Sequence, residues 1–172
     1  METSDLVEVA KNGDKDAFER LVLKYQDVLY KIAKVKMNNE DDICEVVQET
    51  ILAAYKHISK LRDNTYFKTW LIKILINKCN DYYKRPYKND VSLDSFEYDN
   101  LSNSKELNSE INFESLISEL DQDEKTIMVL HYSEGYKEKE IAEILNMNYG
   151  SLRTKMKRAK EKLLKKLEKE GL

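Results

Sequence analysis

The chain has 172 residues, of which 41% are hydrophobic and 35% are charged, with only four glycines and one proline. So few glycines and prolines argue against a turn-rich β architecture, and the hydrophobic fraction is sufficient for a packed core. The composition therefore predicts an all-α protein. The length fits one domain or two small ones, so the number of domains has to come from the organisation of the chain.

Several classes of protein and site are not expected. No segment approaches the roughly 20 apolar residues that a membrane-spanning helix requires, and the N-terminus lacks the layout of a secretory signal, so we expect a cytoplasmic protein. Cys44 and Cys79 form no CxxC pair and stand among apolar neighbours, which predicts buried free thiols. His57 and His131 lack ligand spacing, so no metal site is expected.

The net charge of −3 argues against a nucleic-acid partner, but its distribution argues for one. Between positions 56 and 88, nine basic residues stand beside two acidic ones, and between positions 149 and 166 eight stand beside one. Two basic segments in an otherwise acidic chain predict contact with a polyanion at two places.

The N-terminal half is expected to form four helices. Ser4 can cap a short helix that ends at Gly13, and Asp14 can cap the next, in which apolar residues recur three and four apart from 17 to 33. A third helix is expected from about 42 to 58, and a fourth from about 66 to 84. Pro86 stops the fourth helix because proline lacks an amide hydrogen.

The amino-acid composition changes after the fourth predicted helix. Residues 89–112 are rich in Ser, Asn, Asp and Glu with only scattered apolar residues, which predicts a flexible, acidic linker. The sequence thus predicts two small helical domains, 1–88 and 113–172.

The C-terminal half is expected to contain a helix-turn-helix. Asn112 can cap a helix over 113–120, and Asp121 with Glu124 forms a capping box for the next one. Two further helices are expected from about 138 to 145 and from about 149 to 169, with Asn148 capping the turn between them.

The last predicted helix has two faces. At about 100° per residue, one face is apolar and predicted to be core: Leu152, Met156, Ala159 and Leu163. The opposite face carries long donors near the helix start, where a recognition helix meets base edges and phosphates: Arg153, Thr154, Lys157 and Arg158. A Lys-rich face is often only solvated, but this one follows a capped turn and an apolar helix, which favours DNA contact.

Four segments together resemble extracytoplasmic-function (ECF) sigma factors along nearly the whole chain. In order, they are CEVVQETILAAY, FKTWLIKILINKCNDYYKR, EIAEIL and YGSLRTKMKRAKEKL. The resemblance implies two helical domains, called regions two and four, on a flexible linker. It also implies core RNA polymerase and promoter DNA as partners, an anti-sigma factor that is membrane-bound in many relatives, and no cofactor or small-molecule substrate.

The resemblance assigns roles to residues of the first domain. A motif that docks on the polymerase in this family is matched by five consecutive residues, with Glu45 in place of the usual Asp: Glu45, Val46, Val47, Gln48 and Glu49. Asn77 matches an asparagine of the pocket for a base flipped from the minus-ten element, a task that suits an amide because it both donates and accepts. Lys73, Lys56 and Arg62 are expected to contact the DNA backbone around it.

In the second domain, Arg153, Thr154 and Arg158 match positions that contact the minus-thirty-five element, with Lys155 and Lys157 nearer the backbone. Lys137 stands where a capping Ser or Thr is common, so a weaker helix start is expected there.

Two other functions stay open from the residues alone. The chain could be an independent helix-turn-helix regulator that binds paired operator half-sites without polymerase. It could instead be an adaptor that binds only protein, although two basic segments would then have no use. An enzyme is not expected, because no phosphate loop, nucleophile arrangement or metal cluster is legible.

Overall fold

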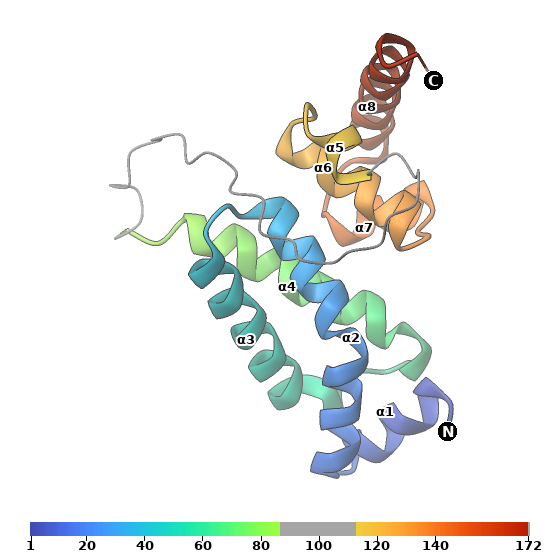
Figure 1. Cartoon of the computed structure of the whole chain (residues 1–172). Coiled ribbons are helices and arrows are strands. Elements are labelled where there is room, and N and C mark those ends of the chain that lie inside the picture. Colours follow the sequence, from blue (N-terminus) through green and yellow to red (C-terminus); the bar gives the residue numbers. More distant parts are fainter. Residues whose placement is uncertain (87–112, 172) are drawn as a thin grey trace.

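The first group of helices forms the lower part of the molecule in Figure 1. A computed structural model describes residues 1–86 and 113–171, and every regular element in these ranges is helical. The group consists of α1 (Thr3–Lys11), α2 (Lys15–Lys36), α3 (Glu40–His57) and α4 (Phe67–Tyr83). Two 3₁₀ turns, Ile58–Lys60 and Asn64–Tyr66, connect α3 to α4.

The second group lies above the first in the same view (Figure 1) and ends in the longest of its helices. It consists of α5 (Phe113–Ile117), α6 (Gln122–Met128), a π-helical turn (Val129–Ser133), α7 (Glu138–Ile144) and α8 (Tyr149–Lys169). The all-α class and the helix-turn-helix are therefore confirmed. The predicted linker, 89–112, and the predicted cap Asn112 lie outside the described residues.

Most helix starts follow the predicted capping chemistry. Asp14 Oδ1 accepts a hydrogen bond from the Ala17 amide at 2.8 Å, and Asn148 Oδ1 accepts one from the Gly150 amide at 2.8 Å. Each satisfies an amide that the first turn of a helix leaves without a partner. The prediction for Ser4 was wrong: α1 begins at Thr3, and its cap is Glu2.

The Glu2 cap works because Asp5, three residues later, accepts a hydrogen bond from the Glu2 amide at 3.3 Å. At Lys137, the N-cap of α7, no side chain caps the first turn, because a lysine cannot accept a hydrogen bond. Only the other half of a capping box forms: Glu140 Oε2 accepts from the Lys137 amide at 2.7 Å. The weaker helix start expected there stays a prediction.

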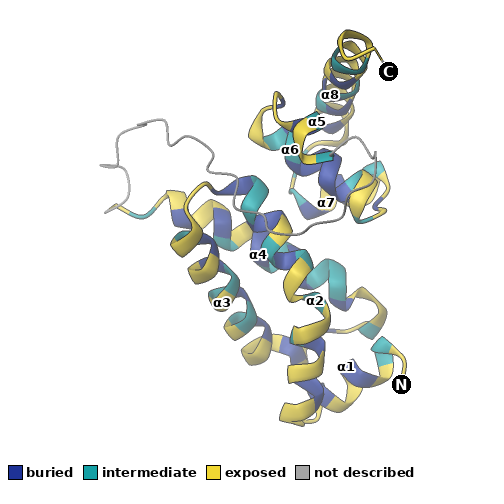
Figure 2. Ribbon diagram, viewed as in Figure 1, coloured by how far each residue is buried: buried dark blue, intermediate teal, exposed yellow. Residues whose placement is uncertain are grey.

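The core of the first group is formed largely by α2, α3 and α4, whose ribbons alternate between buried and exposed residues (Figure 2). Phe67 and Leu71 are buried, and Trp70 packs half-buried against Phe67 with ring centroids 5.8 Å apart. Burial of each large apolar side chain contributes about 1.5 to 3 kcal/mol. The fully buried Thr50 hydroxyl donates to the Val46 carbonyl at 2.8 Å, so no polar group of this side chain is stranded.

The predicted core face of α8 is confirmed. All four of its residues are buried: Leu152, Met156, Ala159 and Leu163. Beside this face, Glu124 is only 2% exposed and accepts from Lys162 Nζ through both carboxylate oxygens, at 3.0 and 2.8 Å. Since a buried carboxylate needs such partners, this pair ties α6 to α8.

The two cysteines differ in solvent exposure. Cys79 is fully buried, as predicted, and burial raises the pKa of its thiol to about 11. Cys44 is exposed on α3, so its predicted burial was wrong. Ile43, Val46 and Val47 lie close to it in sequence, but on a helix successive residues point about 100° apart, so apolar neighbours in sequence do not bury it. Within the described ranges, no helix is both long and apolar enough to cross a membrane.

Candidate protein and nucleic-acid interfaces

Glu45 and Glu49 lie one turn apart on α3 and are joined by one arginine from beyond α4. Arg85 Nη1 donates to Glu45 Oε1 and Nη2 to Glu49 Oε1, both at 2.7 Å. The Arg85 guanidinium also lies 4.9 Å from the centroid of the Tyr82 ring. The hydrogen bonds that Arg85 donates to Glu49 and Glu45 raise the pKa of Arg85. The two carboxylates are therefore held in fixed orientations on the surface of α3.

The five residues of the docking motif do not share one environment. Gln48 and Glu45 are exposed, Glu49 and Val47 are half-buried, and Val46 is fully buried. Val46 is therefore a core residue, and Glu45 and Gln48 are the members of the motif that lie exposed on the surface of α3.

Two large exposed apolar side chains extend this surface. Leu52 is 55% exposed and Tyr55 is 45% exposed. At 100° per residue they lie within about 80° of Cys44 and Gln48 around the helix. We call Cys44, Glu45, Gln48, Glu49, Leu52 and Tyr55 the docking face. The spacing of 44, 48, 52 and 55 was the signal in the sequence that could have identified Leu52 and Tyr55.

Other acidic groups near the start of α3 are bonded within the protein. Tyr30 donates its hydroxyl hydrogen to Glu40, and this hydrogen bond, with burial, raises the pKa of Tyr30 to about 12. Tyr82 likewise donates to Asp42. These carboxylates lie in the first turn of α3, where the helix dipole favours negative charge.

The predicted minus-ten residues fall into two places. Lys73 and Asn77 lie one turn apart on α4, with Asn77 exposed and Lys73 half-buried. Lys56 and Arg62 are exposed near the connection between α3 and α4. Asn77 lies about 15 Å along the α4 axis from Phe67, the first residue after that connection, at 1.5 Å per residue. The structure thus places two of the four residues within α4 and two near the connection that precedes it.

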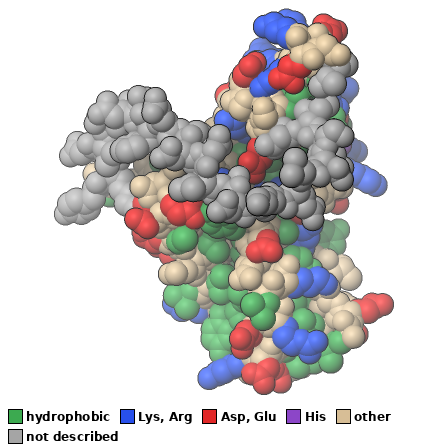
Figure 3. Space-filling model, viewed as in Figure 1, with side chains coloured by type: hydrophobic (Ala, Val, Ile, Leu, Met, Phe, Trp, Pro, Cys, Tyr) green, Lys and Arg blue, Asp and Glu red, His purple; other side chains and the backbone are tan. Residues whose placement is uncertain are grey.

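The outer side of α8 carries the predicted minus-thirty-five residues. Arg153, Thr154, Lys157 and Arg158 are all exposed, and we call these four the recognition face. Figure 3 shows Lys and Arg side chains along the part of the molecule formed by α8. The structure separates Lys155 from this set: it is half-buried and paired with Asp123 of α6, which raises its pKa.

Glu138 of α7 also borders the recognition face, and sequence reasoning missed it. Its Oε2 accepts from the Tyr149 hydroxyl at 3.2 Å and lies 4.0 Å from Arg153 Nε. Arg153 remains 67% exposed, so it is free to turn toward a ligand. Thr154 donates its hydroxyl hydrogen to the Gly150 carbonyl at 3.1 Å.

Comparison with known proteins identifies the family. Residues 21–88 match the family described as Sigma-70 region 2, and residues 111–163 match Sigma-70, region 4. An ECF RNA polymerase sigma-E factor of Haemophilus influenzae is 33% identical, over 95% of this chain and 94% of that protein. The chain belongs to the ECF sigma factors of the sigma-70 family.

A second relative agrees with that assignment, and a solved structure shares the fold. The RNA polymerase sigma-H factor of Pseudomonas aeruginosa is 29% identical over 95% of this chain and 92% of its own. The solved sigma factor RpoE, in complex with the anti-sigma factor NepR from Bartonella quintana, has the same fold. It matches with a TM-score of 0.70 at 20% identity, over 90% of this chain and 98% of that one.

Proposed function

We propose that this alternative sigma factor binds core RNA polymerase through the docking face of α3 and directs initiation at promoters that its two helical groups recognise. One observation carries the proposal: oppositely charged side chains lie on separate helical groups, with Glu45 exposed and Glu49 half-buried on α3, and with Arg153 and Arg158 exposed on α8. Complementary charge on a partner would steer assembly at the first and hold DNA at the second.

The proposed division of labour follows the two family matches. Residues 1–88 act as region two, 89–112 as a linker and 113–172 as region four. In region two, Asn77 reads an unstacked base of the minus-ten element, while Lys73, Lys56 and Arg62 contact phosphates along the strand.

In region four, Arg153, Thr154 and Arg158 reach base edges of the minus-thirty-five element, and Lys157 contacts the backbone. Lys155 holds α8 to α6 through Asp123, and we assign it a structural role in place of a phosphate contact.

The sigma factor is proposed to act in the cytoplasm, where chromosome and polymerase meet, and to have no enzymatic activity of its own. An anti-sigma factor is its proposed regulator, because a solved protein of the same fold is bound to one. The competing function, an independent operator-binding regulator, finds no support in the sigma-factor relatives.

Reconstituted transcription tests the proposal. Core polymerase is incubated with a library of promoter fragments, with and without the full-length chain. Specific transcripts that require the chain are the expected result. Operator binding without polymerase, together with no such transcripts, would establish the regulator instead. A Gln48→Ala variant that fails to direct transcripts while retaining its helical circular dichroism would assign the loss to docking.

A further inference from the structure

Arg153 differs from the other two cations of the recognition face, Lys157 and Arg158. Its Nε atom lies 4.0 Å from Glu138 Oε2 of α7, and the centre of its guanidinium lies 5.9 Å from the centroid of the Tyr149 ring. Neither Lys157 nor Arg158 forms an ion pair in the described part of the chain. One cation of this face is therefore supported by a carboxylate and an aromatic ring, whereas its neighbours are not.

The two supports of Arg153 also contact each other. The Tyr149 hydroxyl donates to Glu138 Oε2 at 3.2 Å, so one carboxylate oxygen faces both this hydroxyl and the Arg153 Nε atom. Tyr149 and Arg153 are four residues apart on α8, the spacing at which side chains of a helix meet. A guanidinium beside an aromatic ring is also attracted by the π electrons of the ring. Each of the three side chains thus contacts the other two.

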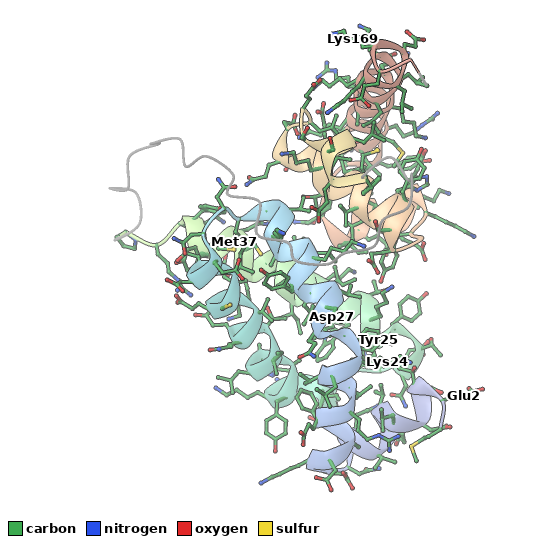
Figure 4. The ribbon with its side chains drawn as sticks, in the orientation of Figure 1. Glu2, Lys24, Tyr25, Asp27, Met37 and Lys169 are labelled. Carbon is green, nitrogen blue, oxygen red and sulfur yellow. The ribbon has the colours of Figure 1, made fainter. Side chains whose placement is uncertain are left out.

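The backbones that carry these side chains are anchored. Glu138 is the first residue of α7, and Ile141, one turn later, is fully buried. Leu152, which precedes Arg153 on α8, is fully buried as well. In Figure 4, Lys169 marks the last turn of α8, so the first turn lies at the opposite end of this helix. The start of α8 is therefore held firmly beside α7.

These contacts engage one edge of the Arg153 guanidinium and leave the other edge exposed. Among the described residues, neither Nη1 nor Nη2 of Arg153 has a protein acceptor, and the side chain is 67% exposed. An open cavity of about 570 Å³ adjoins it, with a lining that includes Glu138, Thr154 and Lys157. Two parallel N–H groups of an arginine fit the O6 and N7 atoms of guanine. The free edge of Arg153 therefore has both the donors and the space for a guanine.

Glu138 opposes DNA binding in one respect. The first helix of a helix-turn-helix crosses the DNA backbone, so a carboxylate at the start of α7 repels phosphates. That repulsion lowers the affinity for every DNA sequence alike, because phosphates carry no sequence information. An oriented Arg153, in contrast, favours only sequences with guanine at the position that it reaches. The effects of Glu138 on affinity and on sequence preference can therefore be measured separately.

We propose that Glu138 and Tyr149 are positioning residues, which hold Arg153 for a bidentate contact with one guanine of the minus-thirty-five element. The assignment of DNA as the ligand rests on the proposed function, whereas the orientation of Arg153 does not. A side chain that is already oriented loses less conformational freedom on binding, so the correct contact forms more readily. Because exposed ion pairs are modest in strength, the expected contribution to guanine preference is about two- to fivefold.

Promoter binding by the reconstituted holoenzyme tests the proposal. The full-length chain is assembled with core polymerase, and affinity is measured at one salt concentration for promoters with each base at each minus-thirty-five position. The wild type should prefer guanine at one position by about 5- to 150-fold, and Arg153→Ala should lose that preference. Glu138→Gln should lower the preference about two- to fivefold, while it raises the affinity for the other sequences.

Two further variants separate orientation from charge. Tyr149→Phe keeps the ring and removes the hydroxyl that donates to Glu138, so it should lower the guanine preference without a change in charge. Glu143→Gln removes the same charge as Glu138→Gln from an exposed position of α7 and should keep the preference intact. Circular dichroism verifies that each variant retains its helices. If Glu138→Gln and Tyr149→Phe keep the full preference, or if Glu143→Gln reduces it equally, the proposal is wrong.

Nuclear magnetic resonance of the free chain tests the orientation without DNA or polymerase. The order parameter of Arg153 Nε should exceed that of Arg158 Nε, because Arg158 has no ion pair among the described residues, and should fall in Glu138→Gln. If it does so but the holoenzyme makes no promoter-specific transcripts, the orientation stands and the proposed function fails. If such transcripts appear but the two arginines are equally mobile in the wild type, the proposed function stands and the positioning role is rejected.

Discussion

Arg85 donates through Nη2 to Glu49 Oε1 at 2.7 Å, and so fastens the chain just beyond α4 to the middle of the docking face. The same guanidinium reaches Glu45. A basic partner segment that approaches this face therefore finds carboxylates that already have a cation. In the proposed docking, a basic side chain of the polymerase displaces the Arg85 guanidinium from the carboxylates of Glu45 and Glu49.

Arg85→Gln should raise the affinity for core polymerase, because it removes the cation that Glu45 and Glu49 share, although Lys78 still lies 4.0 Å from Glu49. Exposed pairs contribute about 0.2 to 1 kcal/mol, so the fold should survive with a small loss of stability. Lys84→Gln is the control: Lys84 is exposed, adjacent and of equal charge. Equal affinity changes in the two variants would mean that only net charge matters at this surface.

Gln48→Ala should weaken holoenzyme assembly by about 1 to 2 kcal/mol while the free energy of unfolding changes by less than about 0.5 kcal/mol, since Gln48 is exposed. Val46→Ala should do the reverse and lower the free energy of unfolding by about 2 kcal/mol, because Val46 is fully buried. Denaturant titration and polymerase affinity, measured on both variants, separate the two roles. Normal assembly by Gln48→Ala would remove this residue from the docking face.

Arg158→Ala should weaken use of the cognate promoter by about 1 to 3 kcal/mol if Arg158 reads a base edge. Lys155→Ala should affect promoter choice little and should instead loosen α8 from α6, because Lys155 pairs with Asp123. Transcription from a library of minus-thirty-five sequences, alongside thermal unfolding, measures both effects. If Lys155→Ala instead changes the preferred minus-thirty-five sequence, Lys155 contacts DNA and its assignment to a structural role is wrong.

The two thiols should react at different rates. In the native protein at pH 8, a disulfide reagent should modify the exposed Cys44 quickly and the buried Cys79 only on unfolding. Burial raises the pKa of Cys79 to about 11 from 9.0. The neutral thiol is therefore favoured by folding, and its contribution to stability is complete below pH 9 and declines as the pH rises to about 11. Cys79→Ala, compared with the wild type over this range, should lack that component of the decline.

The sequence was sufficient for features that arise within one helix. The period of Leu152, Met156, Ala159 and Leu163 predicted a buried face, and the structure confirms it, because helical geometry alone decides which residues share a side. Capping by Asp14 is equally local.

Features that depend on a second element were not accessible in this way. Lys155 stands in a basic run and was grouped with the DNA-facing residues, but its ion pair comes from Asp123, 32 positions earlier. Arg85 meets Glu45 across 40 positions, and no periodicity links them. The site residues that the resemblance assigned to DNA and polymerase stay predictions, to be tested by the variants above.

The position of Arg85 has a consequence for the route of the polypeptide. Region two ends, in the described residues, at Pro86, one residue after the arginine that grips α3. The chain therefore leaves region two beside the proposed docking face. If polymerase binds this face, a protein that covers the face would also contact Pro86, so a single binding event would block polymerase and restrain the distance between the two helical groups.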